Sequence, residues 1–117
     1  MSTRSDDVTL LDLEAACRDL IDFPGTAGQE TFLADRKTQA AIRHQLLIIG
    51  EATKRLSRSF RDRNASVPWR AMTGMRDTLI HGYDTVNLIE MWLTATEDVP
   101  RLLTILESVR PLSRDDP

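Results

Sequence analysis

Residues 42–60, IRHQLLIIGEATKRLSRSF, contain the longest regular apolar pattern in this chain, and our prediction of the fold starts from them. Its apolar positions alternate between steps of four and three residues, and they comprise Ile42, Leu46, Ile49, Thr53, Leu56 and Phe60. That spacing predicts an α-helix with one buried stripe. Leu47, Ile48 and Ala52 widen the apolar arc, so we expect this helix to pack against two neighbours.

The same helix should begin after Asp35, whose side chain can act as the N-cap, and continue to about Arg63. Asn64 is the expected stop. Gly50 lies in its interior, where glycine costs about 1 kcal/mol relative to alanine. We therefore expect another segment of backbone to cross the helix closely at Gly50.

Two shorter segments precede this helix. Residues 6–23 form the expected first helix, with a buried stripe of Leu10, Leu13, Cys17 and Leu20 and with Ile21 beside it. A proline- and glycine-containing turn at residues 24–28 ends it, and residues 29–34 should add a single helical turn.

Three boundaries define the second half of the chain. Ser66 is the expected N-cap of a third helix with Pro68 in its first turn, and Gly82 should end that helix in a left-handed conformation. Its buried edge is expected at Trp69, Met72, Met75 and Leu79. Asn87 and Glu90 predict a capping box for a fourth helix, with a stripe of Leu88, Met91, Trp92 and Ala95. Pro100 should interrupt it, and residues 102–109 continue as a last helix or a kinked extension.

The pattern as a whole predicts an all-α protein. We find no segment with strand periodicity and no internal repeat, so we expect an antiparallel up-and-down bundle of four to five helices. Residues 1–110 should form a single domain, and residues 111–117, which have little apolar content, a flexible tail.

Composition limits the compartment and the class of protein. The chain has 117 residues, 41% hydrophobic and 28% charged, which is typical of a globular domain. No apolar run is long enough to cross a bilayer, and the first residues do not resemble a signal peptide. Cys17 is the only cysteine, so an internal disulfide is excluded and we expect a buried, unreactive thiol. These features predict a cytoplasmic protein without a membrane partner.

The net charge of −3 argues against a general nucleic-acid coat protein, but the charge is unevenly distributed. Residues 1–35 carry two basic and eight acidic side chains. A basic run follows later: Lys54, Arg55, Arg58, Arg61 and Arg63, opposed only by Asp62. Alone, this run is best explained as a solvated helix end. An RNA-binding interpretation is of interest only because of the motif that follows.

That motif is R-x-x-x-x-H-x-Y, formed by Arg76, His81 and Tyr83. On a straight helix Arg76 and His81 lie about 140° apart, close enough for a long arginine side chain to share a pocket with the imidazole. Tyr83 would point away from His81 unless the helix breaks at Gly82. The spacing therefore works as a site only if Gly82 allows that break.

These groups suit cleavage of RNA by its own 2′-hydroxyl. The attack on the adjacent phosphate needs a base that titrates near neutral pH and a cation for the developing charge, which a histidine and an arginine provide without a metal or other cofactor. His44 is the only other histidine, and no metal-ligand spacing, Ser-His-Asp arrangement, phosphate-binding glycine loop or HExxH motif is present.

The segment at residues 74–83, GMRDTLIHGY, resembles the signature of HepT-type toxins in the HEPN superfamily. The similarity extends to residues 37–40, 48–56 and 67–70, and covers the chain from the first helix to about residue 109. It implies a HEPN bundle that forms a homodimer, with two R-x-x-x-x-H motifs around one cleft. His44 and Gln45 depart from the family pattern, which puts a contribution of that helix face to the cleft in question.

The resemblance also implies roles. Arg76 and His81 would be catalytic, and Asp77 would orient them. Tyr83 would be the residue that an MntA-like nucleotidyltransferase antitoxin AMPylates, in a type VII toxin–antitoxin system acting on RNA. Two alternatives remain open: a catalytically inactive HEPN module that binds nucleotide or a protein partner, and, ranked last, a plain helical adaptor in which Arg76 and Asp77 merely pair on the surface.

Overall fold

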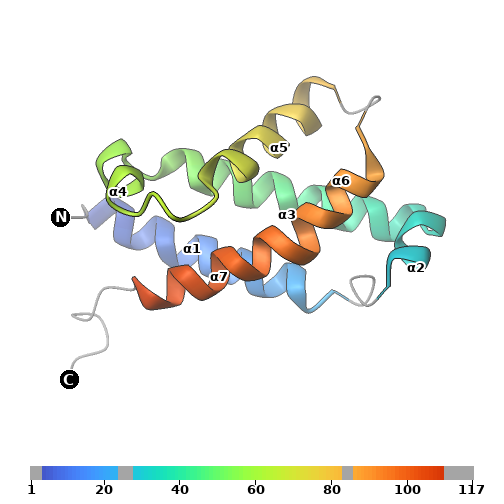
Figure 1. The fold of residues 1–117 in the computed structure, drawn as a ribbon, viewed down its shortest axis with the longest axis horizontal. Coiled ribbons are helices and arrows are strands. Elements are labelled where there is room, and N and C mark those ends of the chain that lie inside the picture. The colour runs from blue at the N-terminus through green and yellow to red at the C-terminus, as the bar shows by residue number, and fades with distance from the viewer. Residues whose placement is uncertain (1–3, 24–27, 83–85, 110–117) are drawn as a thin grey trace.

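The computed structural model describes residues 4–23, 28–82 and 86–109. All regular structure within these ranges is helical, in the order α1 (Arg4–Ile21), α2 (Gln29–Ala34), α3 (Arg36–Arg55), α4 (Arg58–Arg63), α5 (Trp69–His81), α6 (Leu88–Leu93), a π-helical turn η3 (Thr94–Asp98) and α7 (Val99–Ser108). The long segments alternate in direction along the bundle (Figure 1). The prediction of an all-α helical bundle is confirmed.

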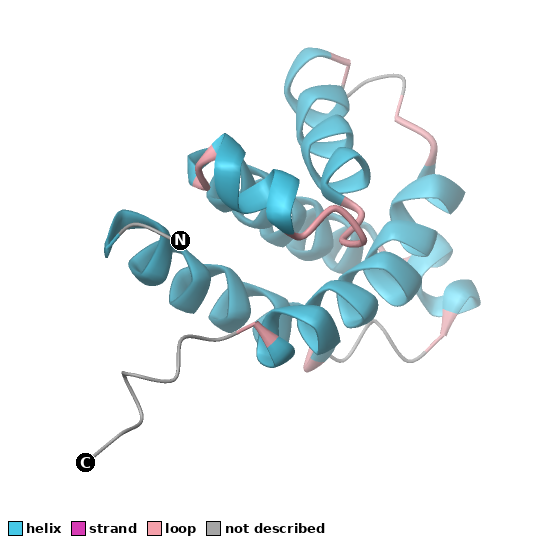
Figure 2. Ribbon diagram, turned by 60° about the vertical axis from the view of Figure 1, so that its left-hand side comes forward, coloured by secondary structure: helices cyan, strands magenta, loops and turns pink. Residues whose placement is uncertain are grey.

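Helix α3 is the central element of the bundle. It packs most extensively against α5 and α1, as its wide apolar arc predicts. All six predicted stripe positions are buried: Ile42, Leu46, Ile49, Thr53, Leu56 and Phe60. Figure 2, in which the left-hand side of Figure 1 comes forward, shows helices joined by short loops in the described part of the chain.

The crossing predicted at Gly50 is the contact between α3 and α5. A Cβ atom added to Gly50 would lie 2.9 Å from Cγ of Arg76 and 3.1 Å from the carbonyl oxygen of Met72. Only a residue without a side chain allows the two helices to approach this closely. The prediction of a close crossing is confirmed, and the crossing places Arg76 against α3.

One predicted helix is two helices in the structure. Asp35 caps α3 as expected, accepting a hydrogen bond from the Lys37 amide at 3.0 Å. However, α3 ends at Arg55, because the C-cap residue Leu56 has an extended ψ of 142°. Ser57 then caps α4, and the carboxylate of Asp6 accepts hydrogen bonds from both the amide (2.8 Å) and the hydroxyl (2.7 Å) of Ser57. Asn64 ends α4, as predicted.

The cap predicted for the third helix was wrong. Pro68, not Ser66, occupies the N-cap position of α5, and no side chain caps this end. The loop before it folds on itself, because the Val67 amide donates to the Asn64 carbonyl and the Trp69 amide to the Val67 carbonyl. Ser66 therefore lies outside the helix. The predicted buried edge of this helix is confirmed, since Trp69, Met72, Met75 and Leu79 are all buried.

Gly82 ends α5 as predicted, but its conformation is not left-handed. Its φ is −141° and its amide donates to the Thr78 carbonyl at 2.8 Å. Asn87 caps α6 by accepting a hydrogen bond from the Glu90 amide at 3.1 Å. Pro100 does not interrupt the last helix, because the π-helical turn η3 leads directly into α7 and places Pro100 in its first turn.

The remaining sequence predictions concern α1 and the ends of the chain. Cys17 is completely buried, and burial raises the pKa of its thiol to about 12, so the expectation of an inert cysteine is confirmed. Ile21, in contrast, is exposed at the end of α1. The predicted tail at residues 111–117 lies outside the described residues. None of the described helices combines the length and the apolar character needed to span a bilayer.

Candidate functional site

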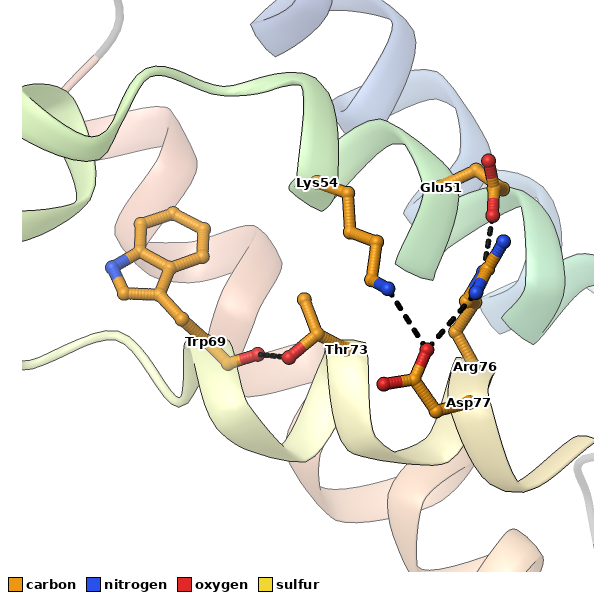
Figure 3. A network of polar contacts seen from close by, with 6 residues as sticks. All are labelled: Glu51, Lys54, Trp69, Thr73, Arg76 and Asp77. Carbon is orange, nitrogen blue, oxygen red and sulfur yellow. Dashed lines mark hydrogen bonds and ion pairs between the residues drawn. The ribbon is translucent and has the colours of Figure 1, made fainter. Parts of the chain in front are cut away.

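Arg76 projects from the middle of α5 toward α3. Its Nε donates to Oε1 of Glu51 on α3, and its Nη1 donates to Oδ1 of Asp77 at 3.0 Å (Figure 3). The Arg76 side chain is 20% exposed to solvent. The absence of a side chain at Gly50 makes this position possible, because Arg76 Cγ occupies the space that a Cβ on Gly50 would need.

Asp77 is the second member of this cluster and has two cationic partners. Lys54 donates from Nζ to Oδ1 of Asp77 at 2.9 Å, and the same oxygen accepts from Arg76. The hydrogen bond from Lys54, followed by that from Arg76, lowers the pKa of Asp77 below its ordinary value. The hydrogen bonds to Asp77 and then to Glu51 raise the pKa of Arg76. Both shifts favour the charged forms of Asp77 and Arg76, and the two basic and two acidic side chains of the cluster have a formal net charge of zero.

His81 occupies the last turn of α5 and is exposed. Within the described residues, no hydrogen bond or ion pair joins the imidazole to Arg76 or Asp77. Gly82 directly after it ends the helix, which supplies the break that the sequence required. Tyr83, the predicted modification site, lies outside the described residues.

The sequence predicted Arg76 and Asp77 as neighbours, and the structure places them together, but it adds Glu51 and Lys54 from α3. The sequence predicts neither as a site residue, because Lys54 belongs to the basic run and Glu51 to residues 48–56, one of the segments that resemble the family. Pairs between helices far apart in sequence carry no local spacing signal. The one available clue was Gly50, because a close crossing brings the adjacent Glu51 against the partner helix.

The arrangement fixes the arginine and leaves part of it free for a ligand. Glu51 and Asp77 engage Nε and Nη1, whereas Nη2 carries two further N–H donors. A guanidinium oriented in this way suits a phosphate, which it can bind through two parallel hydrogen bonds. Among the described residues, no group of three histidine, cysteine, aspartate or glutamate side chains is arranged to hold a metal ion.

Comparison with known proteins agrees with these features. The family model described as "Ribonuclease HepT-like" matches residues 13–109, which include α3, α5 and the whole R-x-x-x-x-H motif. The chain belongs to the ribonuclease HepT-like family. The match covers most of the bundle, so the resemblance to HepT-type HEPN proteins seen in the sequence is confirmed.

Individual relatives of this HepT-like chain are similar over most of their length. A protein of Thermococcus cleftensis named "Probable ribonuclease HepT" is 44% identical over 69% of this chain and 74% of its own. A Methanocaldococcus jannaschii protein named as a candidate RNase is 33% identical over 93% of this chain and 100% of its own. Another candidate RNase, from Caldanaerobacter subterraneus, is 40% identical over 74% of this chain and 77% of its own. No solved structure matches the chain significantly.

Proposed function

We propose that this chain is a metal-independent endoribonuclease toxin in which His81 and Arg76 perform the chemistry. The observation that carries the proposal is the pairing of Arg76 with Asp77 and Glu51, five residues before an exposed histidine on the same helix. Membership of a ribonuclease family supports RNA as the substrate. Asp77 is the positioning residue, because it holds the guanidinium rather than the substrate.

The reaction is a transesterification within the RNA. His81 as general base removes the proton from a ribose 2′-hydroxyl, and the 2′-oxygen attacks the adjacent phosphorus. Arg76 stabilises the negative charge that develops on the non-bridging oxygens. The bond from phosphorus to the 5′-oxygen breaks, that oxygen takes up a proton, and the other fragment ends in a 2′,3′-cyclic phosphate. A second His81, acting as general acid, can supply that proton.

That second histidine would come from a homodimer. Two exposed isoleucines support a dimer face next to the site: Ile48, 39% exposed, lies one turn before Glu51 on α3, and Ile80, 43% exposed, lies one turn after Arg76 on α5. Apolar side chains on both sides of the Glu51–Arg76 pair favour contact with another copy over contact with water. Such a dimer would bring two motifs to one cleft.

We assign the control of this activity to Tyr83. This residue follows Gly82, which is the C-cap of α5 and comes directly after His81. An adenylyl group on its hydroxyl would place a phosphate and a purine beside the site, where the anion competes for Arg76 and repels RNA. A cognate MntA-like nucleotidyltransferase antitoxin would add this group. Co-expression should increase the intact mass by one or more AMP units in the wild type but not in Tyr83→Phe, and an unchanged wild-type mass would refute this control.

The structure also offers an argument for a second candidate, an inactive HEPN module that binds nucleotide or a protein partner. Two carboxylates already satisfy much of the charge on Arg76, which is the arrangement of an arginine that fastens α5 to α3. In that case Arg76→Ala would lower stability and His81→Ala would have no consequence.

Cleavage of a labelled RNA by the purified chain distinguishes the two functions. We expect the wild type to cleave and His81→Ala and Arg76→Ala each to lose cleavage, with the helical circular dichroism of His81→Ala unchanged because its side chain is exposed. Arg63→Ala, which removes an exposed arginine elsewhere, is the matched control. Full activity of His81→Ala would refute the proposal.

A further inference from the structure

A hollow of about 590 Å³ lies between α4, the loop after it and the start of α5. Three arginines line it: Arg58, Arg61 and Arg70. Trp69 forms part of the wall and is held in place, since its indole Nε1 donates to the carbonyl oxygens of Arg61 (3.1 Å) and Asn64 (3.0 Å). Asp62 is the only acidic residue among those lining the hollow. The hollow is therefore strongly cationic.

The positive charges in the hollow are poorly neutralised by the described part of the chain. Nε of Arg61 is buried without a hydrogen-bond partner, and Arg70 forms no ion pair there. Arg58 approaches Asp62 only at 3.9 Å, with both side chains largely exposed, so this pair contributes little. A buried guanidinium nitrogen without an acceptor is costly and calls for an anion or water.

The hollow is connected to His81 by one face of α5. Arg70 and His81 are eleven residues apart, which is three helical turns, so they point in directions that differ by only about 20° and lie roughly 16 Å apart along the axis. Gly74 lies on the same face and is exposed, and a Cβ added there would meet nothing within 4 Å. This face thus has a cation at one end and an imidazole at the other, with Gly74 and Asp77 between them. Glu90 and Asp98 line a second hollow beside Gly74.

We propose that the hollow lined by Arg58, Arg61 and Arg70 binds a backbone phosphate of single-stranded RNA, two or three nucleotides away from the bond presented to His81. The inference deepens the proposed ribonuclease function and rests on it for the identity of the strand. Phosphodiesters suit the hollow because guanidinium groups bind them through paired hydrogen bonds. The RNA would follow α5 past Gly74, and Asp77 would not repel it strongly because Lys54 and Arg76 neutralise its charge.

The salt dependence of RNA binding tests the site. All variants carry His81→Ala so that a fluorescent single-stranded oligoribonucleotide stays intact, and binding is followed by anisotropy from low to high salt. Each phosphate contact contributes about 0.7 to the slope of log K against log salt for single strands. We expect Arg70→Ala to reduce the slope by about 0.7 and Arg58→Ala,Arg70→Ala by about 1.4. Arg63→Ala removes the same charge from α4 but not from the hollow, and should leave the slope unchanged.

The path along α5 is tested by two substitutions of equal size. Gly74→Glu places a negative charge between the hollow and His81, whereas Gly74→Gln adds the same bulk without charge, and neither meets a neighbour at Cβ. Binding should weaken several-fold at low salt for Gly74→Glu alone. Equal binding by the two variants would contradict this path.

The remaining outcomes separate this inference from the proposed function. An unchanged slope for Arg70→Ala and Arg58→Ala,Arg70→Ala overturns the phosphate site even if the wild type cleaves RNA. Binding of AMP that depends on Arg70, without an effect on the RNA slope, identifies a site for free nucleotide and also overturns the inference. Reduced slopes together with a wild type that does not cleave RNA support the phosphate site and refute the ribonuclease.

Discussion

Gly50 and Arg76 meet at the crossing of α3 and α5, where a Cβ on Gly50 would lie 2.9 Å from Cγ of Arg76. The absence of a side chain at Gly50 therefore has two consequences. It lets α3 and α5 approach each other, and it lets Arg76 on α5 reach Glu51, the next residue of α3. The position of the proposed catalytic arginine is thus coupled to the packing of the core.

This coupling predicts opposite effects for two glycine substitutions. Gly50→Ala should lower the free energy of unfolding by about 1–3 kcal/mol, because its methyl group collides with Arg76 and with the Met72 backbone. Gly74→Ala, in an open part of α5, should raise it by about 0.5–1 kcal/mol through helix propensity alone. Denaturant unfolding measures both. A stabilised Gly50→Ala protein would show that the two helices separate easily.

A second prediction concerns acid and the cap of α3. Hydrogen bonds from the Thr38 hydroxyl and the Lys37 amide lower the pKa of Asp35. Because the folded pKa is below the unfolded one, the carboxylate stabilises the fold above the unfolded pKa of about 4, and this contribution is lost as pH falls through the folded pKa.

The measurement is the unfolding midpoint between pH 6 and pH 2. The wild type should lose more stability on acidification than Asp35→Asn, which keeps a capping side chain that does not titrate. Asp35→Ala should be less stable than both at pH 6. Parallel curves for the wild type and Asp35→Asn would contradict the assignment of this cap.

The proposed dimer face predicts a change in mass. Ile48→Asp should convert a dimer to a monomer by light scattering, because it places a charge in the apolar surface beside Glu51 and Arg76. Ile89→Asp is the matched control, since Ile89 is similarly exposed at 41% but lies on α6 rather than on α3 or α5. A wild type that is already monomeric at micromolar concentration would exclude the dimer.

Much of the fold follows from local patterns in the sequence. The buried stripe of α3, the caps at Asp35 and Asn87 and the crossing at Gly50 each depend on neighbouring residues or on a single residue type. The break at Leu56 could not be read in this way, because the apolar spacing continues through it to Phe60. The carboxylate that binds the amide and hydroxyl of Ser57, directly after the break, belongs to Asp6, 51 residues from Ser57.

The candidate site was partly predictable for the same reason. Arg76, Asp77 and His81 share one short motif, so sequence spacing places all three on α5, where Arg76 and Asp77 are hydrogen-bonded to each other. Glu51 and Lys54 reach the site from α3, across an interface that no local period describes. The sequence alone therefore does not show that the cluster of Glu51, Lys54, Arg76 and Asp77 has no formal net charge. That net charge affects how strongly the cluster attracts a phosphate.

We propose that His81 and Arg76 cleave RNA through the 2′-hydroxyl, without a metal. The most direct measurement is the mass of the fragments from a defined oligoribonucleotide incubated with the chain in excess EDTA, beside the same oligonucleotide with 2′-deoxyribose at the cleaved position. We expect a 2′,3′-cyclic phosphate end from the ribose substrate, no cleavage of the deoxy substrate, and no cleavage of either substrate by His81→Ala. Cleavage of the deoxy substrate, or loss of all activity in EDTA, would contradict it.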